Sequence, residues 1–199
     1  EGVWVLAAAP AGHERSEAEL SLLSTLGPTT MVLTGPGSEA FRDVQRRAFT
    51  LCHELPGAPR QFPVTYGLCL YHWGRAELET ARWLAEDLLK AAELRRDDAE
   101  ATIAAHNMSG MIKLSLGDVR AARAHLERSV ACYDPQRDAS LYPVYLMDFG
   151  VFGRFYLALA TLITGDEELA GRHVQDAHEL AARGNQPHTL GFSMAANCS

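Results

Sequence analysis

Residues 31–38 are the first part of the sequence that could bind phosphate, because two glycines follow an apolar run. A phosphate-binding loop of this kind ends in Gly-Lys-Ser or Gly-Lys-Thr, and its lysine reaches the terminal phosphates of the nucleotide. Here Gly37-Ser38 is followed by Glu39-Ala40-Phe41, so that lysine is missing. We therefore interpret the segment as a turn between two helices, in which Ser38 is the N-cap of the second helix.

Cysteine and histidine occur close together at Cys52-His53 and at Cys69-x-x-His72, and each pair could form half of a metal site. Structural zinc needs four convergent ligands, and no Cys-x-x-Cys or His-Glu-x-x-His pattern is present in the sequence. His173 and His178 are five residues apart and so do not share one face of a helix. The sequence predicts no bound metal and no cofactor. We expect Cys69 to pack as a small apolar residue and His72 to lie at the edge of a groove or of the core.

The acidic residues do not form the paired arrangement that acid–base catalysis needs. Asp97-Asp98, Glu167-Glu168 and Glu54 fall at helix ends or on polar faces, where helix capping and solvation account for them. Serine, histidine and aspartate occur without a nucleophile-elbow motif. We expect no catalytic residue and no enzymatic activity, with an enzyme of unfamiliar type as the alternative.

Composition restricts the partners and the compartment. The net charge of −7 and the pI near 5.6 disfavour direct binding of nucleic acid, because phosphate contacts need a field of lysine and arginine. The four cysteines are far apart in the chain, so we expect a cytoplasmic location. The apolar residues 3–9 are too few to span a membrane and follow no basic region. Because the chain starts without Met and ends in an apolar, helix-like stretch, we expect it to be a piece of a longer protein.

Apolar residues recur at three- and four-residue steps through most of the chain, which is typical of amphipathic helices with one buried face. No stretch of strict alternation is long enough to indicate a sheet. Pro28 should kink or split the first helix, because proline removes a backbone hydrogen bond. The predicted helices are 16–33, 38–55, 61–74, 77–94, 98–116, 118–132, 148–164, 166–183 and 187–198.

The turns between paired helices recur at a regular step. When Gly35, Ala76, Gly117 and Gly165 are aligned, the first two steps are 41 residues each and the third is 48 residues. A glycine at this position supplies a left-handed helix end, and Asp118 and Asp166 then cap the next helices. The longer third step contains an insertion at residues 133–148, which two prolines interrupt. We expect this insertion to be an irregular excursion, more mobile than the helices.

Small residues recur at equivalent positions on both sides of these turns. They are Cys69, Gly110 and Ala158 before the turn, and Ala81, Ala122 and Ala170 after it. We expect the two helices of each pair to approach closely at these positions.

Leu26-Gly27-Pro28, Gly117-Asp118 and residues 156–160 are among several stretches that carry a family resemblance. These stretches resemble the tetratricopeptide-repeat region that follows the nucleotide-binding ATPase module of bacterial adenylate/guanylate cyclase-like and LuxR-type multidomain regulators. The resemblance covers roughly Glu14 to the end of the chain. The sequence departs from the family pattern at one place, where Tyr-Gly-Gln-Asp-Pro-Gly is replaced by residues 145–150, Tyr-Leu-Met-Asp-Phe-Gly. The stretches that carry the resemblance are Leu26-Gly27-Pro28, Gly35, Gly37-Ser38, Arg47-Ala48, Leu51-Cys52, Gly117-Asp118, residues 121–127 and 133–136, Asp148, Gly150-Val151, residues 156–160 and Pro187-His188.

The predicted fold is all-α: a tetratricopeptide-like helix-turn-helix solenoid of about four repeats plus a partial terminal helix. After a lead-in at 1–15, the predicted repeats are 16–55, 61–95, 98–132 and 148–183, followed by a partial repeat at 187–199. We expect an apolar face on that last helix, at Leu190, Phe192 and Met194.

The resemblance implies a regulatory module in signal transduction that binds a protein or peptide, or the ATPase and effector domains of its own parent protein, without contacting a membrane. Self-association is a further expectation, because the ends of the array are apolar. A small-molecule effector bound in the concave groove is the alternative function. Each groove residue is also open to an interpretation as core between repeats. The groove residues expected from the alignment are Tyr66, Leu70, Trp73, Asn107, Met111, Leu114, Phe155, Leu159 and Ile163.

Overall fold

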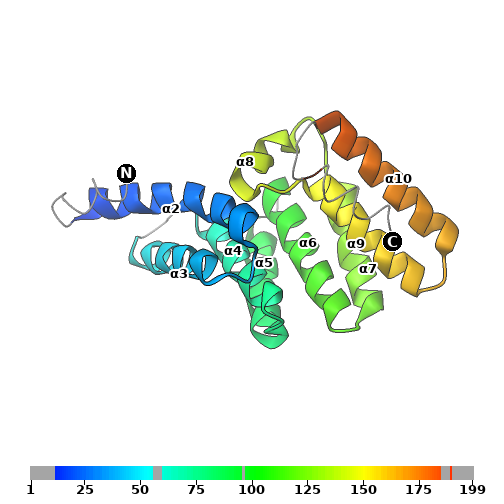
Figure 1. Cartoon of the computed structure of the whole chain (residues 1–199), viewed down its shortest axis with the longest axis horizontal. Coiled ribbons are helices and arrows are strands. Elements are labelled where there is room, and N and C mark those ends of the chain that lie inside the picture. The colour runs from blue at the N-terminus through cyan, green and yellow to red at the C-terminus, as the bar shows by residue number, and fades with distance from the viewer. Residues whose placement is uncertain (1–11, 56–59, 96, 185–188, 190–199) are drawn as a thin grey trace. The chain divides into compact units, whose positions relative to one another are not determined.

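The computed structural model describes residues 12–55, 60–95, 97–184 and 189 (Figure 1). Within these residues the chain is helical and contains no strand, as predicted. The partial repeat at 187–199, including Leu190, Phe192 and Met194, lies outside the described residues except for Thr189, as does most of the lead-in. The elements are α2 (His13–Thr34), α3 (Glu39–Glu54), α4 (Gln61–Gly74), α5 (Leu78–Leu94), α6 (Ala99–Ser115), α7 (Val119–Cys132), the 3-10 helix η1 (Asp138–Leu141), α8 (Tyr142–Tyr145), α9 (Phe149–Ile163) and α10 (Glu167–Gly184).

The chain divides into two compact units, Glu1–Leu84 and Ala85–Ser199, and α5 contributes to both. In the first unit, α3 packs against both α2 and α4. α2 continues through Pro28, so of the two predicted outcomes, a kink or a split, this proline does not split the helix. The apolar core of the unit is formed by Leu20, Leu23, Ala48, Leu51, Cys52, Leu55 and Val64.

The buried Gln45 of α3 lies between two glycines of its neighbouring helices. A Cβ atom on Gly27 of α2 would lie 2.6 Å from the Gln45 amide nitrogen, and one on Gly67 of α4 would lie 2.5 Å from the same side chain. A Cβ atom added to Gly37 would likewise lie 2.9 Å from the Gly74 carbonyl oxygen. These glycines allow three helices to pack around one polar side chain.

In the second unit, consecutive helices pack as antiparallel neighbours (Figure 1). α7 contacts α6 and α9, and α9 contacts α10. Leu126 of α7 packs with Leu157 and Ala160 of α9, and all three are buried. Val151 of α9 packs with Ala177 and Ala181 of α10. Burial of the apolar stripe that each helix presents therefore holds successive helices together.

The four aligned turn residues all adopt a left-handed backbone conformation. The φ angles are 86° at Gly35, 58° at Ala76, 82° at Gly117 and 88° at Gly165. In the last three turns, the N–H of the following residue donates to the carbonyl five residues before it: Glu77 to His72, Asp118 to Lys113, and Asp166 to Thr161. This is the bond pattern of the Schellman motif, which satisfies carbonyls at a helix end. The same turn therefore recurs at Ala76, Gly117 and Gly165, whereas Gly35 shares only the positive φ angle.

A polar residue after three of the four turns caps the next helix, as predicted. Ser38 accepts a hydrogen bond from the Phe41 N–H at 3.2 Å. Asp118 and Asp166 accept from the third residue beyond each, at 3.2 and 3.1 Å. Each cap satisfies one N–H group that a helix start leaves without an intrahelical partner. Residues 35–38 are thus a helix-to-helix turn, and Met31 belongs to a helix.

The small residues also meet as expected in two of the three helix pairs. The buried Cys69 thiol of α4 donates to the Ala81 carbonyl of α5 at 3.1 Å. At the equivalent place in the next pair, a Cβ atom on Gly110 of α6 would lie 3.2 Å from the Ala122 carbonyl oxygen and 2.5 Å from Leu126 Cγ. The two helices of each of these pairs therefore approach closely at the small residues, and at Gly110 no larger residue fits.

The insertion at residues 133–148 is more regular than the sequence analysis expected, because η1 and α8 occupy half of it. Asp134 accepts hydrogen bonds from the backbone N–H groups of Gln136 and Arg137. The Tyr145 hydroxyl donates to Glu100 of α6 at 2.9 Å, which fixes the end of the insertion to a helix 45 positions earlier. Leu141, Tyr145 and Met147 are buried, so the insertion contributes apolar side chains to the interior.

Residues 145–150 keep the conformation that a glycine would favour, although the glycine is replaced. Leu146 has φ 46°, which is the left-handed region. Asp148 caps α9 by accepting from Gly150 and Val151 N–H at 2.9 and 3.1 Å. A Cβ atom on Gly150 would lie 2.3 Å from the Tyr133 ring, so this position requires glycine.

We expect Ala76→Gly and Leu146→Gly to stabilise the protein by about 0.5–1 kcal/mol each, because a left-handed conformation is costly for residues other than glycine. Gly165→Ala is the matched control: no neighbouring atom lies within 4 Å of the added Cβ, so its φ of 88° alone should make the change destabilising. Urea denaturation of the three variants measures these effects. A loss of stability in both glycine variants would contradict the assignment of strain to these turns.

Within the described part of the chain, no single helix combines the length and apolar character needed to cross a membrane. The bent pair Asp138–Tyr145 and Phe149–Ile163 meets the length and composition criteria only when its two parts are taken together.

Candidate functional site

The predicted groove residues differ widely in exposure. Tyr66, Leu70, Asn107 and Met111 are buried, and none of them is more than 4% exposed. These four occupy core positions, as in the core interpretation that the sequence left open. Trp73, Leu114, Phe155 and Leu159 are half-buried, and Ile163 is 63% exposed.

Asn107 is a polar exception among the buried groove positions. Its side chain is fully buried, and neither its amide nitrogen nor its oxygen has a hydrogen-bond partner among the described residues. Gly153 of α9 lies beside it, since a Cβ atom added to Gly153 would lie 3.4 Å from the Asn107 amide nitrogen. Burying an unpaired amide costs about 1–3 kcal/mol, so Asn107 does not serve the stability of the fold.

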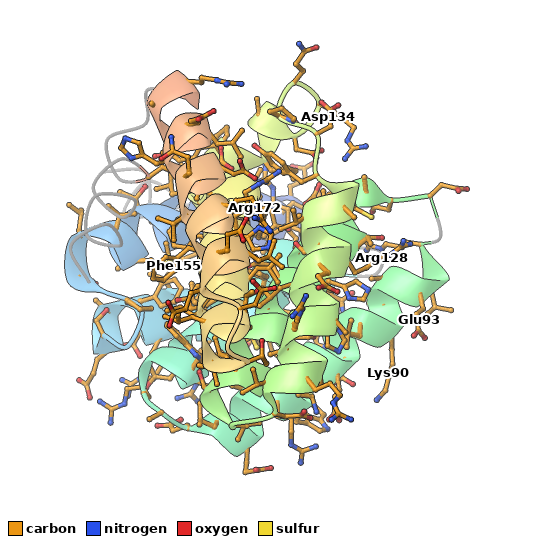
Figure 2. All side chains as sticks on the ribbon, turned by 90° about the vertical axis from the view of Figure 1, so that its right-hand side faces the viewer. Lys90, Glu93, Arg128, Asp134, Phe155 and Arg172 are labelled. Carbon is orange, nitrogen blue, oxygen red and sulfur yellow. The ribbon has the colours of Figure 1, made fainter. Side chains whose placement is uncertain are left out.

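An apolar stripe on α9 is the most exposed part of the predicted groove. Phe155, Leu159 and Leu162 are spaced four and three residues apart and so share one helix face. Exposure rises along this face toward the turn: Phe155 and Leu159 are half-buried, and Leu162 is 51% exposed. With the adjoining Ile163, these residues form what we call the α9 stripe. Phe155 is labelled in Figure 2.

Leu162 is not among the groove residues predicted from the sequence, which include its neighbour Ile163. Trp73 and Leu114 each precede the aligned turn residue by three positions, and the residue with that spacing before Gly165 is Leu162. The alignment of turns therefore contained the signal needed to find it.

A second candidate site is a pocket of about 520 Å³ in the second unit, between α5, α6 and α7. Leu89 and Ala92 of α5 form its apolar wall, and Thr102 and His106 line it from α6. The Thr102 hydroxyl donates to the Asp98 carbonyl at 3.0 Å and is thereby held in place. The volume falls within the range of about 300–1,000 Å³ that is usual for small-molecule sites.

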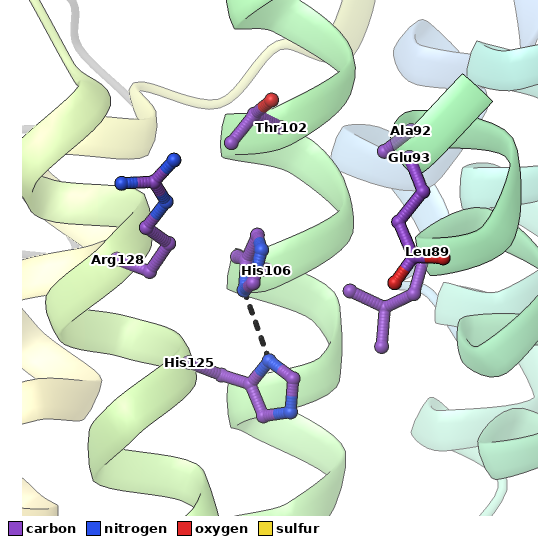
Figure 3. Close-up of a pocket in the computed structure, with 7 residues that line it drawn as sticks. All are labelled: Leu89, Ala92, Glu93, Thr102, His106, His125 and Arg128. Atoms are coloured by element: carbon purple, nitrogen blue, oxygen red, sulfur yellow. Dashed lines mark hydrogen bonds between the residues drawn. The ribbon is translucent and has the colours of Figure 1, made fainter. Parts of the chain in front are cut away.

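Two histidines meet in this pocket (Figure 3). The Nδ1 atoms of His106 on α6 and His125 on α7 lie 3.0 Å apart. Because a hydrogen bond between two such nitrogens needs one donor and one acceptor, at least one ring is neutral. Burial lowers the pKa of His106 to about 4, and the positive charges of His125 and Arg128 act in the same direction. Burial and Lys113 also lower the pKa of His125, while Asp118 opposes this effect, so the pair is uncharged at neutral pH.

Two opposite charges complete the lining of the pocket. Arg128 comes from α7 and Glu93 from α5, and Figure 3 shows them on opposite sides of His106 in that view. Neither side chain makes a hydrogen bond or an ion pair with another residue of the described chain. The pocket thus presents one cation, one anion and an uncharged imidazole pair.

This pocket could not be predicted from the sequence, because its lining residues form no recognisable motif. His106 and His125 are 19 positions apart and belong to different helices. The one local signal is the spacing of His125 and Arg128, which places both on one face of α7.

We expect stability to fall as the pH decreases from about 6.5 to 4, because the unfolded state then binds more protons than the folded state, in which the pKa of His106 is lowered. Above pH 6.5 the ring is unprotonated in both the folded and the unfolded state, so it does not make the stability depend on pH there. The loss should be about 1–2 kcal/mol after allowance for partial exposure of the ring.

The measurement is urea denaturation of the wild type and of His106→Gln across this pH range. His106→Gln should flatten the profile between pH 6.5 and 4. An unchanged profile in His106→Gln would show that His106 titrates normally.

The cysteine–histidine pairs of the sequence analysis are engaged in ordinary packing. Cys69 is fully buried, which raises the pKa of its thiol, and burial raises the pKa of Cys52 as well. His72 Nδ1 lies 2.6 Å from Glu77 across the second turn. No three histidine, cysteine or acidic side chains among the described residues are placed to hold one metal ion.

Comparison of the chain with protein-family models, with curated proteins and with solved structures gives no match to any of them.

Proposed function

We propose that the chain is a tetratricopeptide-like interaction module that regulates a bacterial multidomain signalling ATPase, of the cyclase-like or transcriptional-regulator kind. It acts by binding, and the α9 stripe is its docking surface. The occupant we propose is an amphipathic helix of the ATPase or effector domains in the same protein. Such a helix matches the stripe, because apolar residues at steps of three and four align with Phe155, Leu159 and Leu162.

The observation that carries the proposal is the repetition of one helix pair. The left-handed turn residue, the bond pattern around it and the capping aspartate recur at Gly117 and Gly165. Repeat arrays of this kind present extended binding surfaces, and their units contact mainly their neighbours. The exposure of Leu162 and Ile163 adds a reason to place the partner on α9, because exposed apolar side chains in one stripe mark an interaction surface.

The regulatory part of the proposal is tested by ATP turnover of the nucleotide-binding module with and without this chain added in trans. We expect turnover to change by a factor of about three or more at saturating chain, which corresponds to a change of about 0.7 kcal/mol or more in activation free energy. The chain alone should show no turnover. Equal turnover with and without the chain would contradict regulation, and turnover by the chain itself would contradict a non-catalytic role.

The alternative function, sensing of a small effector, is favoured by a different observation. The pocket at His106 and His125 has the volume and the mixture of apolar and polar lining that small-molecule sites have. It lies between α5, α6 and α7 and not on the predicted groove.

A further inference from the structure

We propose that the pocket between α5, α6 and α7 binds a small zwitterion, with its carboxylate on Arg128 and its amine on Glu93. This inference does not depend on the docking of a protein partner at the α9 stripe. It rests on three features of the pocket: its two opposite charges, its uncharged centre and its apolar wall.

The charges select the ligand class. Arg128 and Glu93 line the same cavity, and each lacks an ionic partner among the described residues. A simple anion would be attracted by Arg128 but repelled by Glu93. A simple cation would be attracted by Glu93 but repelled by Arg128. A molecule that carries both charges satisfies both side chains, and the guanidinium can bind a carboxylate through two parallel hydrogen bonds.

The histidine pair keeps the centre of the pocket neutral. Because His106 and His125 share a hydrogen bond of 3.0 Å, at least one ring is neutral, and burial lowers the pKa of both rings, which disfavours a positive charge that would attract a pure anion. Leu89 and Ala92 provide an apolar wall against which the backbone of an aliphatic ligand can pack. Lys113, which lowers the pKa of His125, and Asp118, which raises it, do not line the pocket.

The experiment uses probes of matched shape, which are 6-aminohexanoate, hexanoate and hexylamine, together with glycylglycine and 4-aminobutanoate as shorter zwitterions. Binding is measured at pH 7.5 by isothermal titration calorimetry. We expect at least one zwitterion to bind about tenfold or more tightly than both hexanoate and hexylamine, because each single-charge probe loses one charge-assisted contact.

Arg128→Ala and Glu93→Gln should each reduce the affinity for that zwitterion about tenfold. Arg120→Ala is the matched control, because Arg120 is an exposed arginine of the same helix that does not line the pocket. Circular dichroism melting establishes that the variants are folded. Equal affinity for zwitterion and single-charge probes, or no binding of any probe at 10 mM, a concentration at which even affinities of about 1 mM are visible, would overturn the proposal.

Discussion

Replacing Gly110 by valine is expected to lower the free energy of unfolding by about 3 kcal/mol, because overpacking a rigid core has costs of this size. The added Cβ would lie 2.5 Å from Leu126 Cγ and 2.8 Å from Leu126 Cδ2. Leu126 cannot move aside, since it is fully buried against Leu157 and Ala160 of α9. Urea denaturation measures the effect.

Gly171→Val is the control for this variant, because nothing lies within 4 Å of a Cβ added to Gly171 in α10. Its effect should stay within about 0.5 kcal/mol, as for other surface changes. Combining Gly110→Val with Leu126→Ala should cost less than the sum of the single changes, because the two side chains compete for one space. If the losses in free energy of unfolding were additive, the effect of Gly110→Val would not arise from a clash with Leu126 between α6 and α7.

Replacing Asp138 by alanine is expected to cost about 2–3 kcal/mol and to loosen the insertion, because three hydrogen bonds to one buried carboxylate are lost together. Asp138 is only 6% exposed. Its carboxylate accepts from the Asp134 N–H at 2.8 Å and from two guanidinium nitrogens of Arg137 at 2.7 Å each. Arg137 also donates to the Cys132 carbonyl, so it connects the insertion to the end of α7.

Hydrogen exchange of residues 134–147, together with urea denaturation, measures this prediction. Asp134→Ala is the matched control, because Asp134 is exposed and caps only two N–H groups, which predicts a smaller loss of about 1 kcal/mol. Similar exchange rates in Asp138→Ala and the wild type would show that the insertion is held by its apolar residues alone.

The long helices and their turns were predictable because the signals are local. An apolar stripe at three- and four-residue steps specifies each helix, and glycine followed by aspartate specifies two of the turns. Ala76 was found only by spacing, since alanine itself gives no turn signal, yet its φ of 58° matches the glycines. The close helix approach at Cys69 and Gly110 was also predictable, because the small residues recur at one offset from the turns.

The insertion and the pocket were not predictable in the same way, since both depend on contacts between distant residues. η1 and α8 are four residues each, too short for a periodic pattern, and Tyr145 is held by Glu100. The pocket forms where His106, His125, Arg128 and Glu93 meet from three helices. The groove prediction failed to separate core from surface, because Met111 and Leu162 are both apolar and differ only in what covers them.

Direct binding tests the central proposal, that this chain is an interaction module with its docking surface on the α9 stripe. The measurement is a calorimetric titration of the chain with the nucleotide-binding module of the multidomain protein to which we propose it belongs. We compare the wild type with the double variant Leu162→Glu, Ile163→Glu, whose positions are exposed enough to leave the fold intact. Leu94→Glu is the control, since Leu94 is 87% exposed at the end of α5, away from α9.

We predict saturable binding by the wild type and by Leu94→Glu, and a loss of at least about tenfold in affinity in the double variant, because two charges would be buried against an apolar helix. Light scattering of the free chain separates this binding from self-association through the same stripe. Absence of binding by the wild type, or equal affinity in the wild type and the double variant, would contradict the proposal.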